Sequence, residues 1–185
     1  MEPPAITRHR RPFLAPVWLT MLAGVVAILA AVVVYRSATT TLVVLVRPVE
    51  KDVGTINDPP LSDEGEQRAQ RLANMFGDKG AVGRLDAIYV SQSRRGEQTA
   101  TPLADRLGKP AVVLPADDAK GTVSRVLREH EGGTVLVIGT SENIPQLLSA
   151  LTRQTIDPAA TDEVGTLFVV SVPTFGDSKV LRLKY

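Results

Sequence analysis

Apolar residues fall into one long uninterrupted segment near the N-terminus and, after it, into short runs and helical stripes. The long segment, Phe13 to Tyr35, has 23 residues and carries no charge. As an α-helix rising about 1.5 Å per residue it would be about 34 Å long, enough to cross a hydrocarbon core of about 30 Å. The alternative is a cleaved signal peptide, but the apolar part of such a peptide is only about 7–15 residues long. No A-x-A cleavage site follows Tyr35. We therefore expect an uncleaved membrane-spanning helix.

Beyond residue 40 the pattern alternates between strands and helices. The run from Leu42 to Val46 is continuously apolar, which is typical of a strand buried on both faces of a parallel sheet. Other apolar runs predict strands at Asp86–Ser91, Ala111–Pro115 and Thr134–Gly139, and a closing hairpin over Leu167–Pro173 and Lys179–Tyr185. Helical stripes lie between them, beginning at Ala69, Ala100 and Ile144, with a further helical stretch at Lys120–Glu131. We predict a three-layer α/β/α sandwich with a mainly parallel sheet.

These patterns divide the chain into a basic tail (residues 1–12), a transmembrane helix (13–35), a linker (36–40) and the α/β domain (41–185). Ser62 is a plausible N-cap for the first helix of the domain, and Gly108 is a plausible stop for the second.

Charge is placed unevenly on this chain, whose net charge is +1. Arg8, Arg10 and Arg11 precede the apolar segment, and Arg36 is the only close basic residue after it. The positive-inside rule therefore places the N-terminus in the cytoplasm and the domain on the extracytoplasmic side. Residues 37–185 hold 17 Lys and Arg against 19 Asp and Glu, so a nucleic-acid partner is not expected. The absence of cysteine excludes disulfides, thiolate metal sites and cysteine nucleophiles.

Polar residues follow three of the predicted strands, at what should be one edge of the sheet. Arg47 ends the first strand, the loop Ser91–Arg95 ends the second, and Gly139-Thr140-Ser141 ends the Thr134 strand. Ligands bind outside the carboxyl ends of such strands, and helix N-termini beside arginines favour a phosphate-like anion. The anion-binding candidates are therefore Arg47, Arg95, Thr140 and Ser141. The alternative is that both arginines pair with acids on a solvated rim, at Glu50, Glu97 or Glu142.

Four sequence blocks resemble those of the histidine phosphatase superfamily, whose members have the phosphoglycerate mutase-like fold. The blocks are L-V-R-P-V-E-K at Leu45–Lys51, L-S-D-E-G at Leu61–Gly65, S-Q-S-R-R-G-E-Q-T-A at Ser91–Ala100 and G-T-S-E-N-I-P at Gly139–Pro145. They occur in the family's order and in the expected strand and helix contexts. The resemblance implies a phosphate pocket in which Arg47 and Arg95 match the family's two arginines.

The same resemblance implies that the usual chemistry is lost. The family's nucleophilic histidine corresponds to Pro48, and its second histidine corresponds to Thr140. Proline has no lone pair with which to attack phosphorus, and threonine offers only a neutral hydrogen bond. Two further departures, Val49 and Glu142, would narrow the pocket or pair with its arginines.

No other residue offers a replacement for the missing histidines. The only histidines are His9, in the basic tail, and His130, which we expect near a helix C-terminus at the opposite edge of the sheet with a structural role. Asp117 and Asp118 are expected to cap a helix, because no histidine or carboxylate cluster accompanies them. No metal and no cofactor are therefore predicted.

The sequence favours a membrane-anchored pseudoenzyme that binds phosphate or a phosphorylated ligand, or serves as an interaction module. Two alternatives stay open. One is an active phosphohydrolase, of the phosphomonoesterase or phosphohistidine phosphatase type, that uses a non-standard mechanism in the same pocket. The other is a purely structural domain without a ligand.

Overall fold

The computed structural model describes residues 17–37, 39–47, 58, 60–77, 84–115, 117–161 and 165–184. The chain forms two compact units, Met1–Ser37 and Ala38–Tyr185. Each unit is described by itself.

The first unit contains one helix, α1 (Val17–Ser37). All side chains from Val17 to Tyr35 are exposed, and this segment of 19 residues is long and apolar enough to cross a membrane. The predicted span began at Phe13, and its first four residues lie outside the described part of the chain. The observed helix continues two residues beyond the predicted end, to Ser37.

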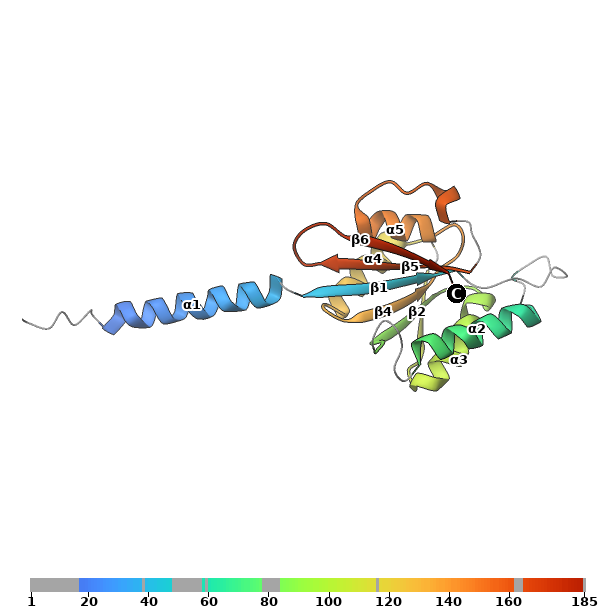
Figure 1. The fold of residues 1–185 in the computed structure, drawn as a ribbon, viewed down its shortest axis with the longest axis horizontal. Coiled ribbons are helices and arrows are strands. Elements are labelled where there is room, and N and C mark those ends of the chain that lie inside the picture. The colour runs from blue at the N-terminus through green and yellow to red at the C-terminus, as the bar shows by residue number, and fades with distance from the viewer. Residues whose placement is uncertain are drawn as a thin grey trace, which may run out of the picture. The chain divides into compact units, whose positions relative to one another are not determined.

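The second unit is built on a six-stranded sheet with the order β3-β2-β4-β1-β5-β6 (Figure 1). Strands β1 to β4 are parallel to one another, and β5 and β6 complete the sheet in antiparallel orientation. The strands are β1 (Thr40–Val46), β2 (Ala87–Ser91), β3 (Ala111–Leu114), β4 (Thr134–Ile138), β5 (Thr166–Pro173) and β6 (Lys179–Lys184). The prediction of a mainly parallel sheet and of a closing hairpin is confirmed.

Helices cover both faces of this sheet. On one face, α2 (Asp63–Phe76) and α3 (Arg94–Leu107) enclose a core that includes Val44, Val46 and Leu72. On the other face, α4 (Ala119–Glu129) and α5 (Ile144–Thr152) enclose a core with Val43, Leu45 and Tyr89. Figure 1 shows these two pairs of helices on opposite sides of the strands. The three-layer α/β/α sandwich is therefore confirmed, and β1 supplies side chains to both cores.

The sheet is not parallel throughout. Its strand β1 is parallel to β4 on one side but antiparallel to β5 on the other. The reason is the path of the chain after α5. The connection forms a 3₁₀ helix, Pro158–Thr161, and the carbonyl of Thr161 contacts Arg47 at the end of β1. Since the chain has returned to the carboxyl edge before β5 begins, β5 can only run back along β1.

Three helix ends lie where the sequence indicates. The hydroxyl of Ser62 accepts a hydrogen bond from the backbone N–H of Gly65 (3.2 Å) and caps α2. Gly108 ends α3 in the left-handed conformation, at φ +61°, which a residue without a Cβ adopts freely. The carboxylate of Asp118 accepts a hydrogen bond from the N–H of Gly121 (2.8 Å) and caps α4, as expected.

Candidate functional site

The fold brings the carboxyl ends of β2, β4 and β1 to one edge of the sheet, in that order. Arg47 follows β1, Ser91 is the last residue of β2, and Gly139 follows β4. The backbone N–H of Gly139 donates a hydrogen bond to the carbonyl of Val46 (2.9 Å), which joins the ends of β4 and β1. The three segments predicted to carry the site therefore meet at this edge.

Arg47 is held by two neighbouring segments. Its Nη2 donates a hydrogen bond to the hydroxyl of Ser141 (2.6 Å), and its Nη1 donates to the carbonyl of Thr161 (3.2 Å). The side chain is half-buried. The structure thus brings together two of the four predicted anion-binding residues, Arg47 and Ser141. Because the hydroxyl of Ser141 accepts from the guanidinium, its own proton can be donated to a ligand.

Asn143 organises the loop between β4 and α5, and its side chain is only 4% exposed. Its Oδ1 accepts a hydrogen bond from the N–H of Thr140 (2.7 Å), and its Nδ2 donates to the hydroxyl of Ser91 (2.7 Å). The backbone N–H of Asn143 donates to the hydroxyl of Thr140 (3.3 Å). One amide therefore ties the end of β2 to the loop after β4. This residue was not among the predicted site residues, although an asparagine directly before a helical stripe is a recognised N-terminal signal.

Gly139 is required by this arrangement. A Cβ at position 139 would overlap the Oδ1 of Asn143 and would lie 2.8 Å from the Cδ1 of Ile144. Both neighbours are fully buried, so neither can move aside easily. The glycine lets the loop fold back onto the start of α5 and places Thr140 and Ser141 at the edge of the sheet.

Arg95 lies in the first turn of α3, directly after the loop that leaves β2. Its side chain is half-buried, and its Nε is buried without a hydrogen-bond partner among the described residues. Buried guanidinium nitrogens are normally hydrogen-bonded, because an unsatisfied donor costs free energy. A phosphate oxygen would be a suitable acceptor for this nitrogen.

The N-terminus of α3 already has an acidic partner, which was not among the predicted site residues. The backbone N–H of Arg94 donates to both carboxylate oxygens of Asp58 (3.0 and 3.1 Å), and the hydroxyl of Ser93 accepts from the N–H of Gly96 (3.1 Å). At this helix end, one of the protein's own side chains therefore supplies the anion. No local pattern marks Asp58, which is 36 residues from Arg94.

The remaining predicted positions divide into two groups. Pro48, Val49 and Glu50 lie outside the described residues. Glu142 is exposed, and no ion pair joins it to Arg47 or Arg95 within the part of the chain that the structure describes. Glu97 is also exposed, on the first turn of α3.

A cavity of about 560 Å³ lies between the N-terminal ends of α4 and α5. Pro145 and Gln146, from the first turn of α5, line one side of it, and Asp118 and Lys120 line the other. Although α5 begins directly after the loop that carries Thr140 and Ser141, none of the four predicted anion-binding residues lines this cavity. Apolar side chains also contribute to it, among them Ala119, Ala150 and Ile156.

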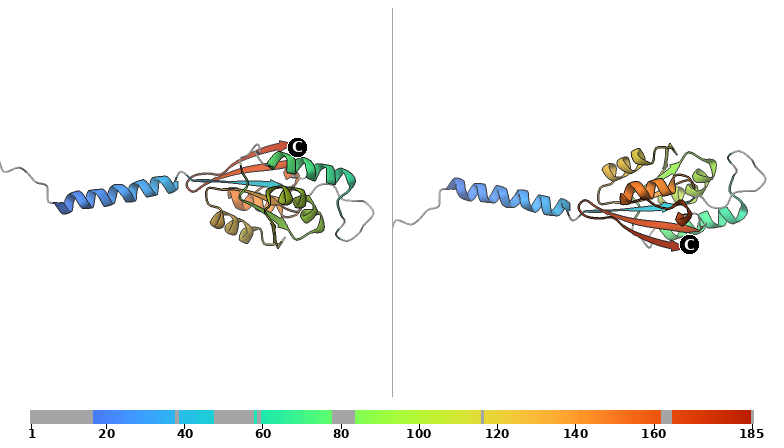
Figure 2. Two further views of the ribbon diagram at one scale, coloured as in Figure 1. Left: turned by 90° about the horizontal axis from the view of Figure 1, so that it is seen from below. Right: turned by 90° about the horizontal axis from the view of Figure 1, so that it is seen from above.

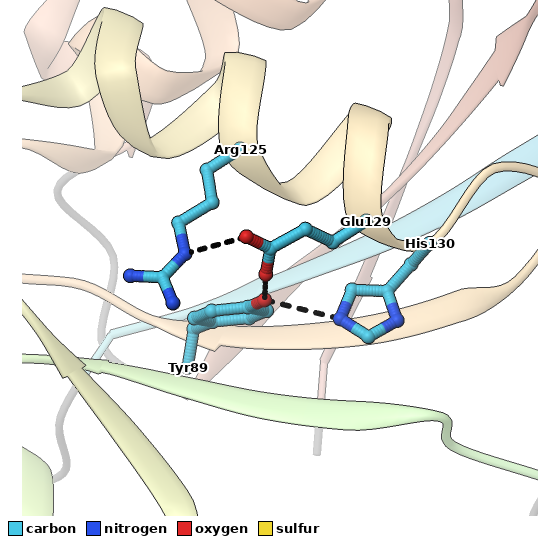
Figure 3. Close-up of polar contacts among 4 residues, drawn as sticks. All are labelled: Tyr89, Arg125, Glu129 and His130. Atoms are coloured by element: carbon cyan, nitrogen blue, oxygen red, sulfur yellow. Dashed lines mark hydrogen bonds and ion pairs between the residues drawn. The ribbon is translucent and has the colours of Figure 1, made fainter.

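His130 belongs to a different cluster, at the C-terminal end of α4 (Figure 3). The hydroxyl of Tyr89 donates to Glu129 (2.9 Å) and lies 3.0 Å from the Nε2 of His130, while Arg125 donates to the other oxygen of Glu129 (3.0 Å). Burial, together with the hydrogen bond and the charge of Glu129, raises the pKa of Tyr89; the hydrogen bond from Tyr89 lowers the pKa of Glu129.

This cluster is structural. α4 runs from the carboxyl edge back to the start of β4, so His130 lies at the edge of the sheet opposite Arg47, as the sequence indicated. Tyr89 is only 1% exposed, which leaves no room for a ligand at its hydroxyl. Among the described residues, no group of three or more histidines, aspartates and glutamates could hold a metal ion.

Comparison with known proteins agrees with this architecture. Residues 36–118 match the model of the histidine phosphatase superfamily, branch 1. No curated protein is similar enough in sequence to match.

Solved structures of phosphatases share the fold. They include the protein histidine phosphatase SixA complexed with tungstate, which is 22% identical, with a TM-score of 0.62 over 77% of this chain and 96% of that one. A phosphoserine phosphatase from Entamoeba histolytica in complex with phosphoserine is 15% identical, with a TM-score of 0.59 over 76% of this chain and 94% of that one. The alpha-ribazole phosphatase from Shigella flexneri is 14% identical, with a TM-score of 0.59 over 78% and 96%.

Proposed function

Since residues 36–118 match the model of the histidine phosphatase superfamily and phosphatase structures share the fold, we propose that this chain is a membrane-anchored pseudophosphatase of that family. Its pocket binds phosphate or a phosphorylated ligand and does not hydrolyse it. The family's attacking imidazole is replaced by Pro48 and the second imidazole by Thr140. Without a lone pair at position 48 no phosphoryl–enzyme bond can form there, so the covalent pathway is lost.

The observation that carries the proposal is the unsatisfied Nε of Arg95 at the edge where Arg47 is held. Arg47 is positioned by Ser141 and Thr161 rather than spread into solvent. Positioned arginines bind phosphate with parallel hydrogen bonds, which are stronger than those between neutral groups. Because Thr140 and Ser141 both accept hydrogen bonds from the protein, their hydroxyl protons can point to the same anion.

The cavity between α4 and α5 is the proposed place for the rest of the ligand. It is lined by apolar residues together with Asp117, Asp118, Lys120 and Gln146. The two carboxylates would repel a phosphate, so the cavity suits the uncharged part of the ligand, a small organic group or a peptide side chain. One of the similar structures is a protein histidine phosphatase complexed with tungstate, and another is a phosphoserine phosphatase in complex with phosphoserine.

Anion binding can be measured on the full-length protein in detergent. We expect phosphate, vanadate or tungstate to raise the melting temperature, and Arg95→Ala to weaken that binding by about tenfold or more, since a hydrogen bond to a charged group contributes about 1.5–3 kcal/mol. Arg71→Ala, which removes the same charge from the exposed side of α2, should bind anions as the unaltered protein does. The unaltered protein should not hydrolyse an aryl phosphate.

Two other outcomes would each support one of the alternative functions. Turnover of the aryl phosphate that Arg95→Ala abolishes would establish an active phosphohydrolase with a non-standard mechanism. A melting temperature that none of the three anions changes would leave a structural domain without a ligand.

We also propose that α1 anchors the protein with the N-terminus in the cytoplasm and the domain on the extracytoplasmic side, because Arg8, Arg10 and Arg11 precede the apolar segment. The chain has no cysteine, so a single introduced thiol reports topology without background. We expect a membrane-impermeant maleimide to label Gln154→Cys in intact cells and to label Ala5→Cys only after lysis. The reverse pattern would place the domain in the cytoplasm.

A further inference from the structure

The turn between β5 and β6 exposes a large aromatic side chain. Phe175 lies in this turn, residues 174–178, and is 67% exposed. The other two phenylalanines within the described residues, Phe76 and Phe168, are buried in the cores. An exposed phenylalanine at the tip of a hairpin is available to enter a membrane surface, where phenylalanine is one of the residues that bury their apolar side chains at the boundary of headgroups and acyl chains.

The turn is fixed to the first residues of the domain. β5 runs antiparallel to β1, and Pro173 pairs with Thr40. The N–H of Thr174 donates to the carbonyl of Thr39 (3.1 Å), and the hydroxyls of Thr39 and Thr174 are 2.9 Å apart. Figure 2 shows the loop between β5 and β6 beside the start of β1. Wherever Thr39 is placed, the turn is therefore placed with it.

The covalent chain limits how far Thr39 can lie from the apolar segment, which ends at Tyr35. Four residues of fully extended chain span at most about 14 Å. The polar interfacial layer of a bilayer is itself about 5–8 Å thick on each side. If α1 spans the membrane, Thr39 and the turn bonded to it must lie at or close to the bilayer surface.

We propose that the turn at 174–178 docks onto the bilayer interface, with Phe175 in the headgroup region. The inference rests on the membrane anchoring proposed above. The occupant is the lipid surface itself, because the length of the linker brings that surface to the turn. Docking would orient the domain: Arg47 follows the seven residues of β1, so the candidate phosphate site would face away from the membrane, about 23 Å further out.

Tryptophan fluorescence of the full chain in phosphatidylcholine vesicles tests this docking. Trp18 is the only tryptophan, so Trp18→Phe combined with Phe175→Trp gives a single emitter at the turn. Trp18→Phe with Val113→Trp is the matched control, because Val113 is an exposed apolar residue on the edge strand β3. Lipids that carry a quencher close to the headgroup should reduce the emission from position 175 at least twofold more than that from position 113.

Two results would overturn the docking, and they are distinguishable. Equal quenching at positions 175 and 113, while Trp18 in the unaltered protein is quenched strongly, would show an anchored domain whose turn does not contact lipid. Absence of quenching at Trp18 as well would show that α1 does not enter the bilayer, and the anchoring would fail together with the docking. A melting temperature equal to that of the unaltered protein would show that both tryptophan variants fold.

Discussion

Replacing Pro48 and Thr140 together by histidine should give the full-length protein phosphatase activity that the unaltered protein lacks. In the proposed pocket Arg47 and Arg95 correspond to the two arginines of the family, and Arg47 donates a hydrogen bond to Ser141. The introduced imidazole at position 48 would attack phosphorus, and the one at 140 would hydrogen-bond to the phosphoryl oxygens. A positioned imidazole that only transfers protons contributes about 10²–10⁴-fold, and the one at position 48 would also open a covalent pathway. Hydrolysis of an aryl phosphate should therefore rise at least about 100-fold.

A single substitution separates the role of the nucleophile at position 48 from that of the hydrogen-bond donor at position 140. Thr140→His alone should stay at background, because it adds a hydrogen-bond donor and no nucleophile at position 48. Adding Arg95→Ala to the double variant should abolish the gain, and Arg71→Ala should leave it. A double variant that still binds vanadate and remains inactive would contradict the prediction, because it would show that the end of β1 cannot aim an imidazole at the bound anion.

Asn143→Ala should lower the free energy of unfolding by about 2–4 kcal/mol. The substitution leaves the N–H of Thr140 and the hydroxyl of Ser91 without their partners. Each buried polar group that loses its hydrogen bond costs about 1–3 kcal/mol. Urea unfolding of the full chain in detergent measures the change, and Gln146→Ala, at an exposed position on the same helix, is the control.

Asn143→Asp separates the effect of this side chain on the stability of the loop from the effect of its charge on anion binding. A carboxylate oxygen can still accept from the N–H of Thr140, and its second oxygen can accept from the hydroxyl of Ser91, which is able to reverse its role. Most of the stability should therefore be retained, while the added negative charge weakens anion binding. Loss of stability in Asn143→Asp as large as in Asn143→Ala would show that the donor to Ser91 is essential.

The sequence predicted those features that depend on local pattern. The apolar run Leu42–Val46 predicted a strand buried on both faces, and β1 contributes to both cores. The cap at Ser62 and the stop at Gly108 follow from backbone chemistry within a few residues. The place of His130, opposite the loops that follow the strands, followed from the alternation of strands and helices.

The features that were missed depend on contacts between distant segments. Asn143 bonds to Ser91, 52 residues away, and Asp58 bonds to the start of α3, 36 residues away. Neither contact leaves a periodic trace in the sequence. The antiparallel position of β5 beside β1 depends in the same way on where the chain after α5 returns to the sheet, which no local rule decides.

The position of β1 between β4 and β5 also determines when this strand can be completed during synthesis. Val43 pairs with Val135 and Val170, which lie 92 and 127 residues further along. The first strand to leave the ribosome therefore has no partner on either side until most of the chain has been made. Its apolar, β-branched composition is that of segments which associate with other chains when left unpaired. A segment that the finished domain buries in both of its cores is thus the one that the growing chain has to keep separate for longest.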